Sequence, residues 1–209
     1  MGDSALRLEF PQAPRLAIQA RLRALSFLLE ADPLPGVMET VPAYTTLVVH
    51  YDPARLSYHQ VVSWVRERIG RVEDSAARPP RRIEVPVRYG GDSGPDLEAV
   101  AAATGLSPAQ AIRLHAERVY TVFLLGFAPG FPYLGVLPRQ LRLPRRASPR
   151  PRVPAGSVAI AGSQTGIYPI DSPGGWHWIG HTPLVLFDPR RELPFLFAPG
   201  DRVRFVPIE

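Results

Sequence analysis

Glycine and proline recur so often after Tyr120 that this half of the chain has room for short strands but not for helices. Its short apolar runs are separated by turn residues and read YTVFLLGF, SVAIAG, GIYPI, PLVLFD and DRVRFVPI. Strands of this length and spacing are typical of a folded sheet or a small β-barrel. We therefore predict a β-barrel here, with Ala198–Asp201 forming the turn before the last strand.

Helices and strands alternate in the first part of the chain. The predicted strands are Ala5–Phe10, Val37–Val41 and Thr45–Tyr51. The predicted helices are Pro14–Ala31, with one face formed by Leu16, Ile18, Leu22, Leu25, Leu28 and Leu29, and a segment after Ser57 that turns Val61, Val62, Val65 and Ile69 inward. The order β-α-β-β-α indicates a split βαβ, ferredoxin-like unit.

A polar segment containing prolines, Glu73–Arg82, separates these two parts and reads as a linker. We therefore predict an α+β protein with an amino-terminal α/β domain over residues 1–80 and a barrel domain over residues 81–209. The barrel domain begins with the strand IEVPVRYGG and two short helices. The second of these has Ser107 as N-cap, Pro108 in its first turn and Gln110 completing a capping box.

Residue usage excludes several kinds of chemistry. All 24 basic side chains are arginine, so neither a Schiff-base lysine nor a P-loop lysine is present. The absence of cysteine excludes disulfides and thiolate nucleophiles and fits a cytoplasmic location. The net charge of +5 is not arranged as a basic stripe, so nucleic acid is not an expected partner. We expect no membrane span and no signal peptide, because no apolar run approaches about 18 residues.

The segment FLLGFAPGFPYLG, from Phe123 to Gly135, is too apolar for an ordinary loop and too rich in glycine and proline for a central strand. Its glycines permit close approach of the backbone, and Pro129 fixes the local conformation. Phe127, Phe131 and Tyr133 are suited to line an apolar pocket. The alternative is a core strand that leaves the barrel through a tight turn.

An arginine-rich segment follows at Pro138–Ser157. It contains Arg145, Arg146, Arg150 and Arg152, and no Asp or Glu occurs between Glu117 and Asp171. Guanidinium groups without local acidic partners bind carboxylate or phosphate in a bidentate manner. We interpret the cluster as an anion-binding loop, and the alternative is a solvated basic loop.

A third segment, Ala161–Pro183, supplies neutral hydrogen-bonding groups between glycines. They are Gln164, Thr165, Tyr168, Ser172 and His177. In a strand, Trp176 and Trp178 would share one face. We expect this segment to provide amide-type contacts to a ligand.

Metal and triad chemistry are not expected here. His177 and His181 are four residues apart, but the segment does not read as a helix and no third ligand accompanies them. Asp171, Ser172 and His177 are too close in sequence for a catalytic triad and lack a nucleophile elbow. No catalytic residue is assigned, and the remaining histidines are interpreted as structural: His50, His59 and His115.

Nearly the whole chain resembles the KipI family, also called the B subunit of 5-oxoprolinase (PxpB) and formerly allophanate hydrolase subunit 1. The matching strings are GDSALRLEF, PGVMETVPAYTTLVVHYDP, VRYGGDSGPDLEAVAAATGLS, YTVFLLGFAPGFPYLGVLP, PRVPAGSVAIAGSQTGIYPIDSPGGWHWIGHTPLVLFDP and PGDRVRFVPI. The resemblance implies a cyclophilin-like barrel in the carboxy-terminal domain. It also implies two partners, KipA or its C-type 5-oxoprolinase homologue and an A-type homologue.

With those partners, the family forms an ATP-dependent enzyme that opens 5-oxo-L-proline to L-glutamate, so the resemblance implies a subunit that is inactive alone. A second branch, the alternative, inhibits the autophosphorylation of a sporulation-related histidine kinase. A small acidic lactam needs a guanidinium partner, hydrogen-bonding groups and an apolar wall. The three segments are candidates to supply these, as half of a site that a partner completes.

Overall fold

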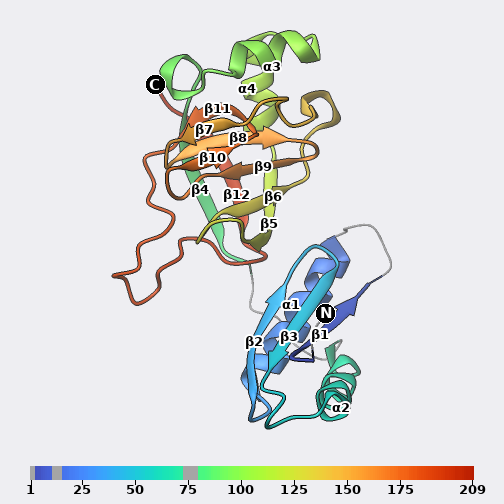
Figure 1. Ribbon diagram of the computed structural model, residues 1–209. Helices are drawn as coiled ribbons and strands as arrows, with labels where there is room; N and C mark the ends of the chain where they lie inside the picture. Colours follow the sequence, from blue (N-terminus) through green and yellow to red (C-terminus); the bar gives the residue numbers. More distant parts are fainter. Residues whose placement is uncertain (1–2, 11–15, 73–79) are drawn as a thin grey trace. The chain divides into compact units, whose positions relative to one another are not determined.

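The computed structural model describes residues 3–10, 16–72 and 80–209 (Figure 1). The chain divides into two compact units, Met1–Pro79 and Pro80–Glu209. That each unit folds as an independent domain stays a prediction, and most of the predicted linker lies outside the described residues. No helix among the described residues is long and apolar enough to cross a membrane.

The first unit contains the predicted order of elements, β1 (Ala5–Glu9), α1 (Leu16–Ala31), β2 (Val37–Pro42), β3 (Thr46–Tyr51) and α2 (Tyr58–Ile69). The strand order is β1-β3-β2, and β3 is antiparallel to both neighbours. The first two residues predicted for the first helix, and the side chain of Leu16, lie outside the described residues. The ferredoxin-like name stays a prediction.

The core of this unit forms between the helices and the sheet. Leu22, Leu25 and Leu29 on α1 pack against Leu47 and Val49 of the central strand. The start of α2 is fixed by a capping box between Ser57 and Gln60. The predicted helix faces are therefore correct in the main, because apolar residues at helical spacing bury one side.

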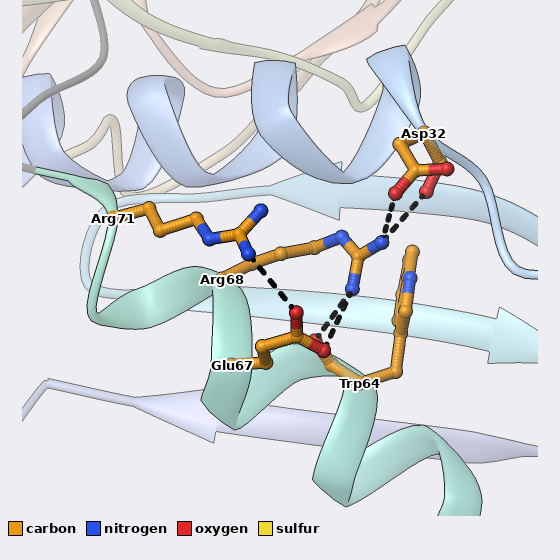
Figure 2. Close-up of polar contacts among 5 residues, drawn as sticks. All are labelled: Asp32, Trp64, Glu67, Arg68 and Arg71. Carbon is orange, nitrogen blue, oxygen red and sulfur yellow. Dashed lines mark hydrogen bonds and ion pairs between the residues drawn. The ribbon is translucent and has the colours of Figure 1, made fainter.

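The inward position predicted for Ile69 is wrong, since its side chain is exposed. Arg68 is buried instead, and Figure 2 shows its guanidinium beside the ring of Trp64. Its guanidinium lies 5.0 Å from the ring centroid of Trp64, donates to the Trp64 carbonyl at 3.2 Å and forms an ion pair with Asp32. A long basic side chain can bury its apolar stem in this way while its charge is paired near the surface.

The second unit is a closed seven-stranded barrel with strand order β11-β4-β12-β5-β6-β9-β8 (Figure 1). Its strands are β4 (Arg82–Tyr89), β5 (Val119–Leu125), β6 (Pro132–Gly135), β8 (Ser157–Ala161), β9 (Gln164–Ile167), β11 (His177–His181) and β12 (Arg202–Pro207). A separate two-stranded sheet pairs β7 (Arg150–Val153) with β10 (Ser172–Gly174). The α+β class and the barrel are confirmed, and the cyclophilin-like name stays a prediction.

Helices α3 (Leu97–Thr104) and α4 (Pro108–Ala116) follow β4, and short 3₁₀ turns lie at Gly91–Ser93 (η2) and Arg139–Leu141 (η3). The predicted capping box of Ser107 and Gln110 is confirmed, with Pro108 in the first turn of α4. Gly105 ends α3 in the left-handed conformation.

The strand predicted for PLVLFD is wrong. This segment holds one isolated bridge, between Phe187 and Phe195. β11 already pairs with β4 and with β8, which closes the barrel and leaves no edge for a further strand. The strands that sequence reasoning missed, β6, β7 and β10, are short and contain proline or glycine.

His115 lies fully buried in the barrel core and is structural, as predicted. Its Nδ1 atom lies 2.7 Å from the Tyr89 hydroxyl, and its Nε2 atom lies 2.9 Å from Thr165 Oγ1. Thr165 donates its own proton to the Ala159 carbonyl, so it accepts from Nε2–H, and Nδ1 accepts from Tyr89. Burial lowers the pKa of His115 to about 3, which keeps the imidazole neutral.

We expect Arg68→Ala to lower the free energy of unfolding by about 2 kcal/mol, because the cation–π contact and the charged hydrogen bonds are lost together. Arg71→Ala is the matched control, since Arg71 forms an exposed pair with Glu67 one helical turn away and should matter little. Urea unfolding of the full chain measures both. Equal losses in the two variants would contradict a buried role for Arg68.

His115 should make stability depend on pH. Its pKa is about 3 in the folded chain against 6.5 for the free side chain, so below pH 6.5 the unfolded chain takes up a proton that the native state excludes. The contribution of His115 to the free energy of unfolding is therefore fully present above pH 6.5. It is lost as the pH falls, by at most about 1.4 kcal/mol per pH unit. His115→Gln should reduce this slope in urea unfolding, and parallel slopes would contradict the assignment.

Candidate functional site

A pocket of about 230 Å³ opens on the second unit. It is lined by Phe127, Phe131, Tyr133, Arg145, Pro149, Tyr168, Pro173, Gly174, Gly175 and Trp176. The lining therefore joins parts of the three segments predicted to form a ligand site. Pockets for drug-sized ligands measure roughly 300–1,000 Å³, so this one suits a smaller molecule.

The aromatic wall is built around Phe131, a buried residue at the end of the turn between β5 and β6. Its ring centroid lies 4.9 Å from that of Tyr133, 5.2 Å from Tyr168 and 5.5 Å from Trp176. Most of these rings meet edge to face, which is a favourable aromatic geometry. Gly174 permits this packing, because a Cβ there would collide with the hydroxyl of Tyr168. The wall is therefore rigid and mostly apolar.

Phe127 stands at the rim of this wall and has an unusual backbone. Its φ of +69° lies in the left-handed region, which costs a residue with a side chain of order 1–3 kcal/mol in a strained context. The residue is 64% exposed, and its ring still contacts the rings of Phe131 and Tyr168. Pro129 lies in the same turn but does not line the pocket.

Arg145 supplies the positive charge of the pocket. The backbone on either side of it is fixed: His177 Nε2 lies 2.8 Å from the Pro144 carbonyl oxygen, and the Arg146 N–H donates to the Gly175 carbonyl at 2.8 Å. Within the described part of the chain, its guanidinium forms no ion pair. It therefore presents an uncompensated cation beside the aromatic wall.

The two tyrosines of the pocket are neutral hydrogen-bonding groups at ordinary pH. Burial raises the pKa of Tyr133 and of Tyr168, and the nearby charge of Arg145 opposes that rise. In Tyr168 a hydrogen bond from the Trp176 backbone also opposes it. A ligand in this pocket therefore meets a guanidinium and phenol groups, while no carboxylate or imidazole is among the lining residues.

The expectation that the arginine cluster lacks acidic partners is wrong for Arg146 and Arg150. Both donate to Asp96 Oδ1 at 2.6 Å, and the Trp178 N–H donates to Asp96 Oδ2 at 2.8 Å. Asp96 is buried at the start of α3, far away in sequence. The lack of acidic residues between Glu117 and Asp171 therefore does not leave these arginines unpaired, because their partner comes from another element.

Arg152 also has a partner, since it forms an ion pair with Asp171 at 2.6 Å. Two hydrogen bonds lower the pKa of Asp171. The larger effect comes from the Ala155 N–H and the smaller from the Arg152 side chain. Both side chains are exposed, so this pair lies at the surface. Of the four predicted arginines, Arg145 alone lines the pocket.

The predicted residues fall into two groups. The structure brings Phe127, Phe131, Tyr133, Arg145 and Tyr168 together, and a direct contact with ligand stays a prediction for each. The other predicted residues do not line the pocket: Pro129, Arg146, Arg150, Arg152, Gln164, Thr165, Ser172 and His177. Thr165 points into the barrel core toward His115, and His177 holds the Pro144 carbonyl.

Sequence reasoning missed Trp176 and the Pro173–Gly175 stretch as pocket residues. Their signal was the run of proline and two glycines directly before a tryptophan, which lets backbone and rings approach closely. Pro149 carries no comparable signal.

Within residues 3–10, 16–72 and 80–209, no three His, Asp or Glu side chains gather closely enough to hold a metal ion. His177 and His181 face different backbone carbonyls, those of Pro144 and Ala155. The arrangement is therefore suited to binding a small acidic molecule with an apolar body, and the pocket lining itself offers no general base.

Three comparisons extend these observations. The model of the carboxyltransferase domain, subdomain C and D, matches residues 1–197. The B subunit of 5-oxoprolinase from Bacillus subtilis (strain 168) is 44% identical and is matched over 100% of this chain and 91% of its own length. The protein of the same name from Escherichia coli O157:H7 is 50% identical, with 99% of this chain and 94% of its own length covered.

The crystal structure of TTHA0988 superposes with a TM-score of 0.86 at 43% sequence identity. The match covers 98% of this chain and 40% of that chain. The present chain thus spans most of the curated relatives but less than half of this longer protein.

Asp96→Asn should destabilise the second unit, because it leaves Arg146 and Arg150 without their shared carboxylate. We expect a loss of about 2 kcal/mol, less than for a fully buried pair because each arginine side chain is 29% exposed. Asp171→Asn is the matched control, since its pair with Arg152 is exposed and should matter little. Thermal unfolding compares the two, and equal stability of both variants would contradict the role of Asp96.

Proposed function

The chain belongs to the 5-oxoprolinase B-subunit family of carboxyltransferase-domain proteins, and from this premise we propose that it is the B subunit of an ATP-dependent 5-oxoprolinase. The observation that carries the proposal is the identity of 44% and 50% over essentially the whole chain to two proteins of that name. The partners are then homologues of the A-type and C-type proteins of that enzyme.

The pocket chemistry supports the substrate class. 5-Oxo-L-proline is a five-membered lactam with one carboxylate. Arg145 is positioned to bind that carboxylate, and the rings around Phe131 suit the methylene groups of the lactam. Tyr133 and Tyr168 retain their protons and can donate to the lactam carbonyl oxygen.

The proposed reaction needs more than this pocket supplies. Water adds to the lactam carbonyl carbon and the ring C–N bond breaks, which gives L-glutamate. ATP would phosphorylate the amide oxygen and leave as ADP, a first water would open the ring to an acyl phosphate with the proton going to nitrogen, and a second water would release phosphate and L-glutamate. Guanidinium groups would stabilise the developing negative charge. Since the lining contains no carboxylate or imidazole, the general base and the ATP site are assigned to the partner proteins.

The chain is accordingly expected to be inactive alone and to contribute half of a shared site. Inhibition of a histidine kinase, the alternative, is not favoured by any observation on the fold or the pocket. The relatives matched over the full chain carry the name of the enzyme component.

Arg145→Gln should raise the KM of the reconstituted complex for 5-oxo-L-proline by about 10- to 100-fold, because a charged hydrogen bond to the carboxylate is lost. The measurement is formation of L-glutamate and consumption of ATP after mixing the chain with its A-type and C-type partners. The matched control is Arg139→Gln, since Arg139 is exposed and lies outside the pocket lining.

Two results would contradict this assignment. A wild-type complex without turnover would count against the proposed function. An active complex whose KM is unchanged by Arg145→Gln would retain the function but remove Arg145 from the substrate site.

A further inference from the structure

Phe127 combines two features that disfavour a phenylalanine. Its φ of +69° suits glycine, and the residue is 64% exposed although its side chain is apolar. A glycine at this position would avoid both costs. Folding gains from the ring only its edge-to-face contacts with Phe131 and Tyr168, and an outlier of this kind at the rim of a pocket points to function.

The turn that carries Phe127 is held from several sides. The Gly126 N–H donates to the Phe131 carbonyl at 3.1 Å, and the Phe131 N–H donates to the Ala128 carbonyl at 3.0 Å. Gly130 packs so closely on Phe187 that an added Cβ would lie 3.2 Å from the Phe187 Cβ. The neighbours thus impose the conformation at residue 127, and the ring has a fixed place.

That place is the edge of the aromatic wall. The ring of Phe127 stands at 79° to Phe131, with centroids 5.5 Å apart, and at 88° to Tyr168, with centroids 6.3 Å apart. It also lines the same pocket as Arg145. A ligand whose carboxylate binds Arg145 would therefore have its body limited in size by Phe127.

We propose that Phe127 is a specificity-determining residue whose exposed ring restricts the pocket to a small, five-membered ring acid. The proposal rests on the proposed function, because the ligand class is taken from it. The bound ligand covers the exposed face of Phe127, while the rest of the ring stays packed on Phe131 and Tyr168. One extra ring methylene is then rejected by a factor of roughly 10 to 200.

The test compares 5-oxo-L-proline with its six-membered homologue, which has one additional ring methylene, in the complex reconstituted with the A-type and C-type partners. Wild type should prefer the smaller lactam at least about tenfold in kcat/KM. Phe127→Gly should reduce this preference about tenfold while leaving the melting temperature equal or higher, since glycine accepts the backbone. Phe127→Tyr should keep the preference.

Leu193→Ala is the control, because Leu193 is 80% exposed and does not line the pocket. It should match wild type in both lactams. An active complex in which Phe127→Gly keeps the wild-type preference would overturn the inference and leave the proposed function intact.

If the wild-type complex shows no turnover, the proposed function fails and binding decides the role of Phe127. Titration of the full chain with 5-oxo-L-proline is followed by tryptophan fluorescence, since Trp176 lines the pocket. The same titration is made with the six-membered homologue. A smaller difference in Kd between the two lactams for Phe127→Gly than for wild type supports the inference. An unchanged difference, or no binding by wild type, overturns it.

Discussion

The pocket depends on one buried carboxylate, that of Asp96. It accepts hydrogen bonds from Arg146, from Arg150 and from the Trp178 N–H, while its own N–H donates to the Trp178 carbonyl at 2.9 Å. This joins the start of α3, the strand β11 and the arginine-rich segment. The position also suits a negative charge, because the amino-terminal end of a helix carries partial positive charge.

The consequence is a division of roles among neighbouring arginines. Arg146 and Arg150 direct their charge to Asp96 and fix the segment, whereas Arg145, between the anchored backbone of Pro144 and Arg146, keeps its charge for the pocket. A flexible loop would lose conformational entropy whenever a ligand binds. A prearranged guanidinium beside rigid rings avoids most of that cost.

Much of the fold was predictable because it rests on local rules. The capping box at Ser107 and Gln110 and the apolar face of α1 follow from short-range chemistry that the sequence displays directly. The short strands β6, β7 and β10 were missed because their pairing depends on distant partners rather than on their own composition. Ile69 was expected to be buried, but Arg68 is buried instead. The ring of Trp64 and the carboxylate of Asp32 stabilise the arginine in that position.

The candidate site was predictable in its aromatic part and less so in its polar part. Glycine, proline and aromatic residues clustered in sequence also cluster in space, so Phe127, Phe131 and Tyr133 were found together. Ion pairs form between residues that are distant in sequence. The ion-pair partners of the four arginines could therefore not be predicted from the residues next to them in the chain.

The chemistry of the lining also explains why such a chain would act within a complex. Its titratable groups are one arginine and two tyrosines whose pKa values burial raises, so the lining can orient a small acid but offers no general base. The one imidazole in the barrel core, that of His115, is committed to Tyr89 and Thr165 and is held neutral. In the proposed function, a partner protein would bring the base and the phosphoryl donor to the open side of the pocket, and the exposed ring of Phe127 would contact the bound substrate.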